Sequence, residues 1–569
     1  MVATTERLSP DRFRDATWGE ILPLFDALAE SPLDRDGVDT WLTSWSDLED
    51  AISEAMTLVL IANSVDTTDT AMEEAYLRFA TEIWPMVEEQ RVRLSERLLD
   101  IDPDRDDLTV TMKSFRNQRD VYRAENVPLK GQLEELGNDY QKITGGMTAM
   151  WEGEEVPLPR LLPYLEEPDR AVRERAFRLV GEPYIRARDE IATVFDRQIA
   201  LRQEVARNAG LANYRDYAFR ELDRFDYGPP ECEAFHDAIE RHVVPAAARR
   251  LARRREVMGI DTLRPWDVGP DPRGRPAIRP FTDGDDLVER LVPVFDRVDP
   301  VLGDYLRTMR DESLLDLDSR TGKAPGGYCV DLPGRRRPFI FMNAAGTTGD
   351  VETMLHEAGH AFHTFESSHL PFRFHRYPGA EMSEVGSMAM ELLAAPYLGQ
   401  DEGGPYAEAD LARARVSQLE GILIATPWIA VIDAFQHWVY TDPDGTDRDA
   451  RDEAFVRIFE RFNPGVDWTG LEDHRLARWY RQLHIFQYPF YYIEYGLAQL
   501  GALQVWRNAL RDQGAAVVAY RQSLALGATR SLPELFAAAG ARFTVDAGEV
   551  GDLVSLIETE LHRLDALDA

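Results

Sequence analysis

The sequence contains few of the features that mark secreted, membrane-spanning or disulfide-stabilised proteins. Two cysteines, Cys232 and Cys329, are too few for a disulfide framework. The N-terminal segment MVATTERLSP lacks the basic and apolar regions of a signal peptide. The longest apolar run, Ile422 to Phe435, contains Pro427 and Asp433 and is shorter than the roughly 20 apolar residues that cross a bilayer. We therefore expect a soluble protein of the reducing cytoplasm.

Positive charge is also scarce. The chain has 100 acidic residues against 64 basic ones, a formal net charge of -36, and only four of the basic residues are lysines. Nucleic acids and anionic membranes would repel such a chain, and no basic run interrupts the acidic background. We expect neither of them as a partner, and the sequence leaves the oligomeric state unknown.

Most of the chain has the apolar periodicity of helices. Residues 38–65 and 70–101 each carry this pattern. Residues 165–210 indicate a pair of long helices that ends at Gly210, a residue suited to the left-handed position after a helix. These patterns predict a mostly α protein.

The helical pattern changes at a few places that divide the chain. We place a domain boundary near residue 166, between residues 1–166 and residues 167–569. Residues 261–285 are rich in proline, glycine and aspartate, which predicts loop or hairpin. The short apolar run Arg337 to Asn343 lies between proline and glycine residues and indicates a strand.

The stretch VETMLHEAGHAFHTFE contains His356, Glu357 and His360 in the pattern H-E-x-x-H. On one helix, residues four apart lie roughly 40° from each other, so the two imidazoles can share a cation. Glu357 lies about 100° round the helix, where it can act on a water molecule without binding the metal. Thr347 is placed to cap this helix, with Asp350 in its first turn.

The alternative is an ordinary amphipathic helix that happens to carry two histidines, and a third ligand separates the two interpretations. Glu366 lies about 280° round the helix from His356 and cannot reach the same ion. The next helical segment, Gly379 to Gly399, is the better source. It carries three glutamates, Glu381, Glu384 and Glu391. One of them can bind the metal while its neighbours orient the ligands, although such a trio can also be a solvated acidic face.

The span GGYCVDLPGRRRPFIFMNAAGTTGDVETMLHEAGHAFH, followed by SEVGSMAMELL, resembles the M3 family of zinc metallopeptidases, the oligoendopeptidase F and thimet oligopeptidase group. The stretches PWIAVIDAFQHWVYTDP and HIFQYPFYYIEYGLAQLGA match the family as well. The resemblance implies that Glu384, 28 residues after His356, is the third ligand of one Zn²⁺ per chain. Glu381 and Glu391 would then lie behind the ligands.

The same resemblance implies a fold, to which we add the boundary placed near residue 166. The fold is a mostly α, zincin-type metallopeptidase with a small β element beside the active-site helix and a deep substrate channel. Residues 1–166 are expected to form an N-terminal helical domain, and residues 167–569 the zinc peptidase catalytic domain.

In HIFQYPFYYIEY, Tyr488, Tyr492 and Tyr495 recur at spacings of four and three. On one helix they form a stripe with His484 one turn earlier, whereas a helix that starts at Pro489 would leave His484 in the preceding loop. An aromatic stripe is often core, but a histidine and three hydroxyls are costly to bury unpaired. The resemblance implies that the side chains that stabilise the transition state come from this segment, at His484, Tyr488, Tyr492 and Tyr495. Among them we expect His484, Tyr492 and Tyr495 to be catalytic and Tyr488 to bind substrate. The segment lacks the glycines of thimet-like members and looks more like oligoendopeptidase F.

We therefore expect a zinc-dependent endopeptidase that hydrolyses internal bonds of oligopeptides, with Glu357 as general base. The predicted strand, with Phe339 and Phe341, could bind the peptide by edge addition. One alternative is a helical zinc carboxypeptidase, which would carry H-E-S-x-S-R where this chain reads SEVGSM. The other is a non-catalytic peptide-binding homologue, which the intact metal motif disfavours. We predict structural roles for Cys232, Cys329, His236 and His437.

Overall fold

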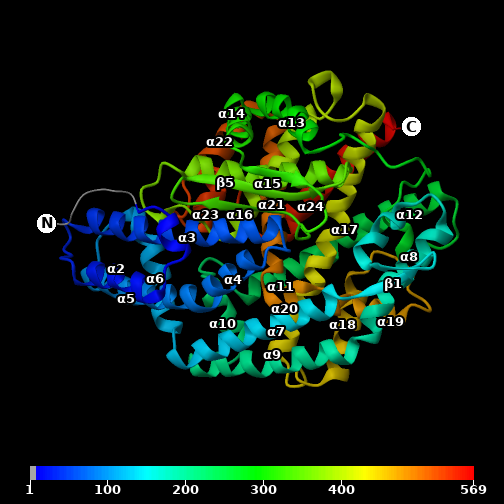
Figure 1. The fold of residues 1–569 in the computed structure, drawn as a ribbon. Coiled ribbons are helices and arrows are strands. Elements are labelled where there is room, and N and C mark those ends of the chain that lie inside the picture. Colours follow the sequence, from blue (N-terminus) through cyan, green and yellow to red (C-terminus); the bar gives the residue numbers. More distant parts are fainter. Residues whose placement is uncertain (1–7, 569) are drawn as a thin grey trace. The chain divides into compact units, whose positions relative to one another are not determined.

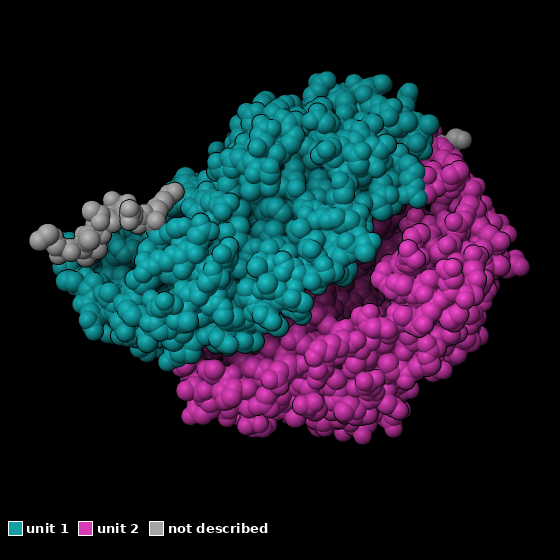
Figure 2. All heavy atoms as spheres, viewed as in Figure 1, with its two compact units in different colours: residues 1–120, 279–411, 501–543 teal, residues 121–278, 412–500, 544–569 magenta. Residues whose placement is uncertain are grey.

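The fold is described for residues 8–568 of a computed structural model, and it is mostly α as predicted (Figure 1). The chain divides into two compact units, each built from three separate segments (Figure 2). Unit 1 comprises residues 1–120, 279–411 and 501–543, and unit 2 comprises residues 121–278, 412–500 and 544–569. Residues on both sides of position 166 belong to unit 2, so these units do not follow the predicted division into residues 1–166 and 167–569.

Unit 1 combines the N-terminal helices with a small sheet and the helices that follow it. Its helices are α1 (Asp11–Arg14), α2 (Trp18–Glu30), α3 (Val38–Val65), α4 (Thr70–Arg78), α5 (Trp84–Ile101), α6 (Thr109–Val121), α13 (Gly284–Val298), α14 (Pro300–Asp311), α15 (Thr348–Ser367), α16 (Ala380–Ala394), α22 (Gln513–Ala525) and α23 (Leu532–Ala538). The predicted helix over residues 38–65 is α3. The predicted helix over residues 70–101 is interrupted by a π-type turn at Phe79–Ile83, just before Pro85, which has no amide hydrogen to donate.

The sheet of unit 1 has the order β3-β5-β4, from β3 (Leu315–Asp318), β4 (Tyr328–Leu332) and β5 (Arg337–Ala344). The predicted strand is β5, and it is the central strand, parallel to β3 and antiparallel to β4. Phe339 is 8% exposed and Phe341 is fully buried. The predicted edge addition at β5 is therefore wrong, because neighbouring strands pair with both of its edges. The role of the two buried rings in substrate binding stays a prediction.

One of the four lysines is buried beside this sheet. The Lys323 Nζ lies 4.4 Å from the centre of the Phe341 ring and donates to Asp316 Oδ1 at 2.8 Å and to the Asp318 carbonyl at 2.9 Å. Its side chain has no exposed surface. The loop between β3 and β4 is thereby fixed to the end of β3.

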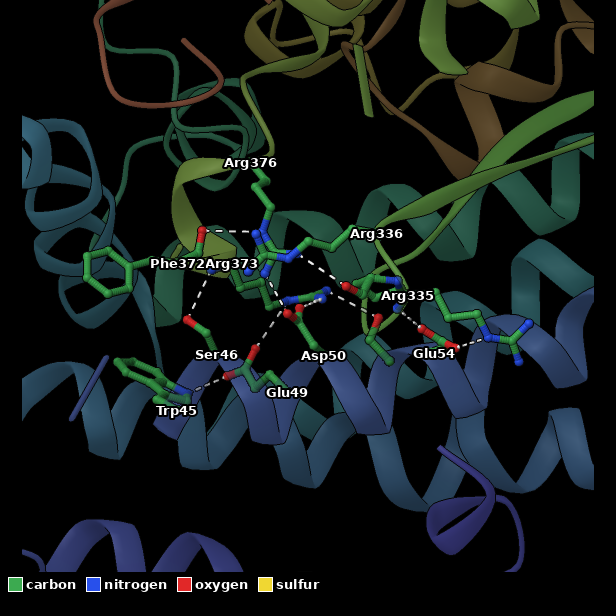
Figure 3. Close-up of polar contacts among 12 residues, drawn as sticks. Trp45, Ser46, Glu49, Asp50, Glu54, Arg335, Arg336, Phe372, Arg373 and Arg376 are labelled. Atoms are coloured by element: carbon green, nitrogen blue, oxygen red, sulfur yellow. Dashed lines mark hydrogen bonds and ion pairs between the residues drawn. The ribbon is translucent and has the colours of Figure 1, made fainter. Parts of the chain in front are cut away.

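A buried polar network joins α3 to the sheet and to the segment before α16 (Figure 3). Three buried acidic residues of α3 contribute to it: Glu49, Asp50 and Glu54. Asp50 accepts from Arg373 Nη1 at 3.1 Å and from Arg376 Nη2 at 2.5 Å. Glu54 accepts from the backbone amide of Arg335, in the β4–β5 turn, at 2.8 Å. Buried hydrogen bonds and ion pairs thus connect the N-terminal helix α3 to the β4–β5 turn and to the segment before α16.

Unit 2 is helical apart from one hairpin. Its elements are α7 (Val127–Gly145), β1 (Thr148–Trp151), β2 (Glu154–Pro157), α8 (Arg170–Arg186), α9 (Arg188–Asn208), α10 (Tyr214–Glu221), α11 (Pro229–Ala238), α12 (Val244–Met258), most of α17 (Glu408–Thr441), α18 (Arg448–Phe462), α19 (Glu472–Tyr480), α20 (Leu483–Gln487), the first half of α21 (Tyr492–Ala509) and α24 (Ala547–Leu567). The predicted helical pair is α8 and α9, and Gly210 follows α9 with a left-handed φ of 77°.

Helix α17 contains the longest apolar run and is longer than that run suggested, because the helix continues through Pro427. Within the described residues it is the one helix long and apolar enough to cross a membrane, by length and composition only. Of its apolar window, 67% is buried inside the protein, as in the core helix of a soluble protein. This single helix is weak evidence for a membrane span.

Candidate active site

Helix α15 carries the H-E-x-x-H motif and follows β5 after a short turn (Figure 1). Its start has the predicted cap: the Thr347 Oγ1 accepts from the Asp350 amide at 3.2 Å, and Asp350 Oδ2 accepts from the Thr347 amide at 2.8 Å. This reciprocal pairing satisfies amides that the first turn leaves free and places a carboxylate at the positive end of the helix dipole. The cap fixes where the motif lies along the helix.

Helices α15 and α16 touch through their backbones. A methyl group added at Gly359, inside the motif, would lie 2.5 Å from the Ser387 Cα and 2.6 Å from the Gly386 carbonyl oxygen. Only glycine permits this approach. As a result, the glutamates of α16 lie against the histidines of α15.

Glu384 is the glutamate that meets both histidines. Its Oε2 atom lies 3.3 Å from His356 Nε2 and 3.6 Å from His360 Nε2. One ligand atom from each of the three residues lies within 4.8 Å of the other two. Ser387 Oγ donates to the same Glu384 oxygen at 2.9 Å, which orients the carboxylate. Two imidazole nitrogens and one carboxylate oxygen therefore converge on one point in unit 1.

The remaining glutamates take different positions. Glu391 Oε1 lies 2.8 Å from His356 Nδ1, so it holds the ring with Nε2 towards Glu384. Glu381 is buried in the first turn of α16, and its orienting role stays a prediction. Glu366 accepts from Arg521 Nε at 2.7 Å, in line with its rejection as a ligand.

The glutamates around His356 favour a positive charge at the point where the three side chains converge. Burial alone would lower the pKa of His356, but its hydrogen bonds with Glu384 and Glu391 raise it to about 10. Burial would raise the pKa of Glu384, but the bond with His356 and the charges of both histidines lower it to about 2. Burial lowers the pKa of His360 to about 4. The two carboxylates that favour a proton on His356 would equally favour a metal cation in place of that proton.

Glu357, the next residue along α15, is 8% exposed. Burial raises the pKa of its carboxyl group to about 7, against the opposing effect of His356, while the backbone amide of Cys329 donates to it. A carboxyl group with a pKa near neutrality can both accept and return a proton.

The aromatic segment of unit 2 is not the single helical stripe that its spacing predicted. Helix α20 ends at Gln487, and α21 begins at Tyr492, so His484 lies on the short helix rather than in a loop or on the same helix as the tyrosines. Phe490 between them has a left-handed φ of 67°. Its carbonyl accepts from Arg224 and its amide donates to Gln436 Oε1, so contacts from distant parts of unit 2 hold the turn.

Nevertheless, the polar rings gather. The His484 ring centre lies 4.8 Å from that of Tyr492 and 6.0 Å from that of Tyr495. Tyr491, off the predicted stripe, lies 6.2 Å from His484, and sequence spacing gave no signal for it. Tyr488 is 55% exposed. The catalytic and substrate roles of these residues stay predictions.

His484 is set up as a neutral donor. Burial lowers its pKa to about 4. The Gln482 amide nitrogen lies 2.9 Å from Nδ1, and because an amide nitrogen can only donate, Nδ1 accepts and the proton lies on Nε2.

Family profiles and curated relatives all relate this chain to the same family of peptidases. Residues 163–548 match the profile of peptidase family M3, and residues 17–115 match that of the peptidase M3 N-terminal domain. Oligopeptidase PepF of Bacillus subtilis (strain 168) is 21% identical over 67% of this chain and 55% of the relative. Oligoendopeptidase F (chromosomal) of Lactococcus lactis subsp. cremoris is 19% identical over 57% of this chain and 53% of the relative. The alignments thus span about half the length of these curated relatives.

Solved structures match over the whole chain. Pz peptidase A, determined with an inhibitor, is 26% identical with a TM-score of 0.88, covering 100% of this chain and 99% of that one. A putative oligoendopeptidase F from Bacillus anthracis str. Ames is 25% identical with a TM-score of 0.85, covering 97% and 98%. The family profile covers more than half of the residues and includes the helices that carry His356, His360 and Glu384, so the chain belongs to peptidase family M3, a family of metallopeptidases.

Proposed function

We propose that the protein is a zinc-dependent endopeptidase that hydrolyses internal peptide bonds of oligopeptides. The observation that carries this proposal is the convergence of His356, His360 and Glu384 beside the buried Glu357. Relatives named oligopeptidase and oligoendopeptidase support the class of substrate. Two free cysteines support a reducing, cytoplasmic location.

The three side chains fit Zn²⁺ rather than a harder cation. Catalytic zinc sites use three protein ligands, often two histidines and one carboxylate, whereas calcium and magnesium prefer oxygen ligands alone. The bond between His356 Nδ1 and Glu391 Oε1 leaves Nε2 as the ligand atom, which is the arrangement usual for a metal-binding histidine.

When bound there, zinc would supply Lewis acidity that polarises the scissile carbonyl group and lowers the pKa of a water molecule. Glu357 takes the proton from the attacking water and returns it to the leaving amine. The Cys329 amide keeps the Glu357 carboxylate in position during both transfers. Glu391 and Ser387 keep His356 and Glu384 oriented.

The peptide backbone would pair with β4 rather than β5. Strand β4 is an outer strand of its sheet, and its Cys329 amide donates to Glu357. A peptide added along that edge by backbone hydrogen bonds would bring its carbonyl groups past the general base.

A series of peptides of increasing length, digested with zinc-loaded protein and analysed by mass spectrometry, tests the proposal. We expect cuts at internal bonds of short peptides, with folded proteins left intact. Glu384→Gln should lose zinc and activity together, whereas the matched change Glu366→Gln should keep both, because Glu366 pairs with Arg521 instead. Stepwise removal of C-terminal residues would indicate a carboxypeptidase, and peptide binding without any cleavage would indicate a non-catalytic homologue.

A further inference from the structure

A second group of metal-binding side chains lies inside unit 2, between helices α11 and α17. Cys232 and His236 are one turn apart on α11, and Asp433 and His437 are one turn apart on α17. One ligand atom from each of Cys232, Asp433 and His437 lies within 4.8 Å of the other two. The exposed fractions of the four residues are 1% for Cys232, 4% for His236, 0% for Asp433 and 7% for His437.

The hydrogen bonds of this group are incomplete. Asp433 Oδ2 lies 2.8 Å from His236 Nε2, but Oδ1 has no hydrogen-bond partner among residues 8–568. Within the same residues, neither ring nitrogen of His437 makes a hydrogen bond, although Nε2 lies 3.3 Å from Asp433 Oδ2. A buried polar atom without a partner destabilises the fold, so the arrangement is unfavourable as it stands. A cation between the two side chains would engage both.

The surroundings make the unpaired atoms more costly. The His437 ring lies 5.8 Å from the Phe219 ring and 5.4 Å from the Phe490 ring, and the His236 ring lies 6.4 Å from that of Phe462. Aromatic walls exclude water and strengthen the interaction of any charges they enclose.

We propose that Cys232, Asp433 and His437 bind a Zn²⁺ ion inside unit 2, with His236 orienting the Asp433 carboxylate. Thiolate, carboxylate and imidazole are all zinc ligands, and no hard-cation site would include the sulfur atom. The thiol releases its proton on binding, and the thiolate and carboxylate charges then neutralise the ion. The ligands come from α11 and α17, and His236 on α11 is 197 residues from Asp433 on α17. The ion therefore joins two helices that come together only on folding. Its effect is to stabilise unit 2.

The test uses the full chain with the first metal site removed. In a His356→Ala/His360→Ala background, the proposed catalytic ligands are gone, so any zinc that stays bound after dialysis reports on another site. We expect about one zinc ion per chain in this background. Adding Cys232→Ser should lower that content at least tenfold, whereas Cys329→Ser, the matched change in unit 1, should leave it unchanged. The result is independent of whether the protein is a peptidase.

Cobalt gives a direct readout of the sulfur ligand. Co²⁺ added to the metal-depleted background should produce a near-ultraviolet thiolate-to-cobalt charge-transfer band, which Cys329→Ser keeps and Cys232→Ser removes. Zinc should also raise the unfolding temperature of the background protein. If Cys232→Ser does not fold, His437→Gln with its intact thiol serves in its place, and we expect it to weaken zinc binding at least tenfold.

Three results would overturn the proposal. The first is a background protein that has native circular dichroism but retains no zinc after it has been supplied with zinc and then dialysed. The second is a cobalt complex without a charge-transfer band. The third is a band that persists in Cys232→Ser, since the sulfur ligand would then be a different one.

Discussion

At the scale of single residues, Glu357 separates chemistry from metal binding. Glu357→Gln keeps the size of the side chain and the hydrogen bond from Cys329, but removes the group that accepts a proton. We expect the variant to keep its zinc and its peptide affinity and to lose roughly 10²–10⁴-fold in kcat. Metal analysis and steady-state kinetics on one peptide check this. Turnover near that of the wild type would remove Glu357 as the general base.

The hydroxyl of Tyr492 can be tested in the same way. It forms hydrogen bonds with Gln482 and Trp428, and burial raises its pKa. If the hydroxyl stabilises the transition state, Tyr492→Phe should lower kcat by roughly 10²–10³-fold with little change in KM. If it only fills the core, kcat should stay and the unfolding temperature should fall. Val518→Ala, at an exposed position on α22, is the control, and it should change neither kcat nor the unfolding temperature appreciably.

The residue scale is where sequence was most informative. His356, Glu357 and His360 are defined by spacing along one helix, and the structure brings them together as that spacing requires. The bend at Phe490 was not predictable, because Arg224 and Gln436, more than fifty residues away, hold its left-handed backbone. The sequence predicts only structural roles for Cys232 and His437 for a related reason. Each i, i+4 pair is weak alone, and only the packing of α11 on α17 joins them.

At the scale of helices and strands, the contact between α15 and α16 determines whether the metal ligands meet. Gly359→Ala adds a methyl group against the backbone of α16, which cannot move away as a flexible side chain could. We expect a loss of about 1–3 kcal/mol in the free energy of unfolding and a clear loss of zinc. Denaturant unfolding and metal analysis measure both.

Gly421→Ala on α17 is the matched control. It lies in an exposed helix interior with nothing within 4 Å of the added methyl group. The higher helix propensity of alanine should stabilise this variant by up to about 1 kcal/mol. Equal behaviour of the two variants would show that the helix contact at Gly359 tolerates a side chain.

The network of Figure 3 predicts a pH dependence for unit 1. Burial would raise the pKa of Glu49, but Arg91, 2.6 Å away, and Arg373 lower it overall. The folded pKa therefore lies below the unfolded value, so the stabilisation by ionised Glu49 is complete above about pH 4.5 and is lost as the pH falls through the folded pKa. Glu49→Gln should lower the free energy of unfolding by about 3 kcal/mol at neutral pH, and less in acid.

Urea unfolding near neutral pH and near pH 4 measures this difference. The gap between the wild type and Glu49→Gln should be narrower near pH 4 than at neutral pH, whereas the exposed Glu73→Gln should match the wild type within about 0.5 kcal/mol at both values. A constant gap between wild type and Glu49→Gln would mean that the carboxylate stays ionised over this range, and the absence of a gap would mean that it does not contribute.

Among the elements, α3, α15 and the α8–α9 pair could be predicted from periodicity and caps, because those signals are local. The central position of β5 could not, because β3 is a four-residue strand with a weak pattern of its own and pairs in parallel. The prediction of a free strand edge failed for that reason.

At the scale of the whole chain, the two units are each assembled from three segments, and this predicts how truncation will behave. A chain of residues 167–569 lacks α3, whose Asp50 and Glu54 bond to the segment before α16 and to the β4–β5 turn. It also lacks α7, whose Tyr140 stacks on Phe486 at 4.0 Å. We expect this fragment to aggregate or remain unfolded and to bind no stoichiometric zinc.

Size-exclusion chromatography, circular dichroism and metal analysis of the fragment beside the full chain check that expectation. A monodisperse, zinc-binding fragment would instead support two consecutive domains with a boundary near residue 166. No local pattern in the sequence shows that unit 1 is completed by residues 501–543, because that follows from contacts between distant segments.

The buried Lys323 has a practical consequence for chemical labelling. Of the four lysine side chains, it is the one without exposed surface, and its amine is already bonded to Asp316. The other three are exposed and lie close together in sequence: Lys113, Lys130 and Lys142. An amine-reactive dye would therefore mark the side chains of α6 and α7 in the native protein, and a fourth labelled lysine would appear only on unfolding. The lysines thus provide a fluorescent reporter of unfolding at the sheet of unit 1 without any engineered cysteine.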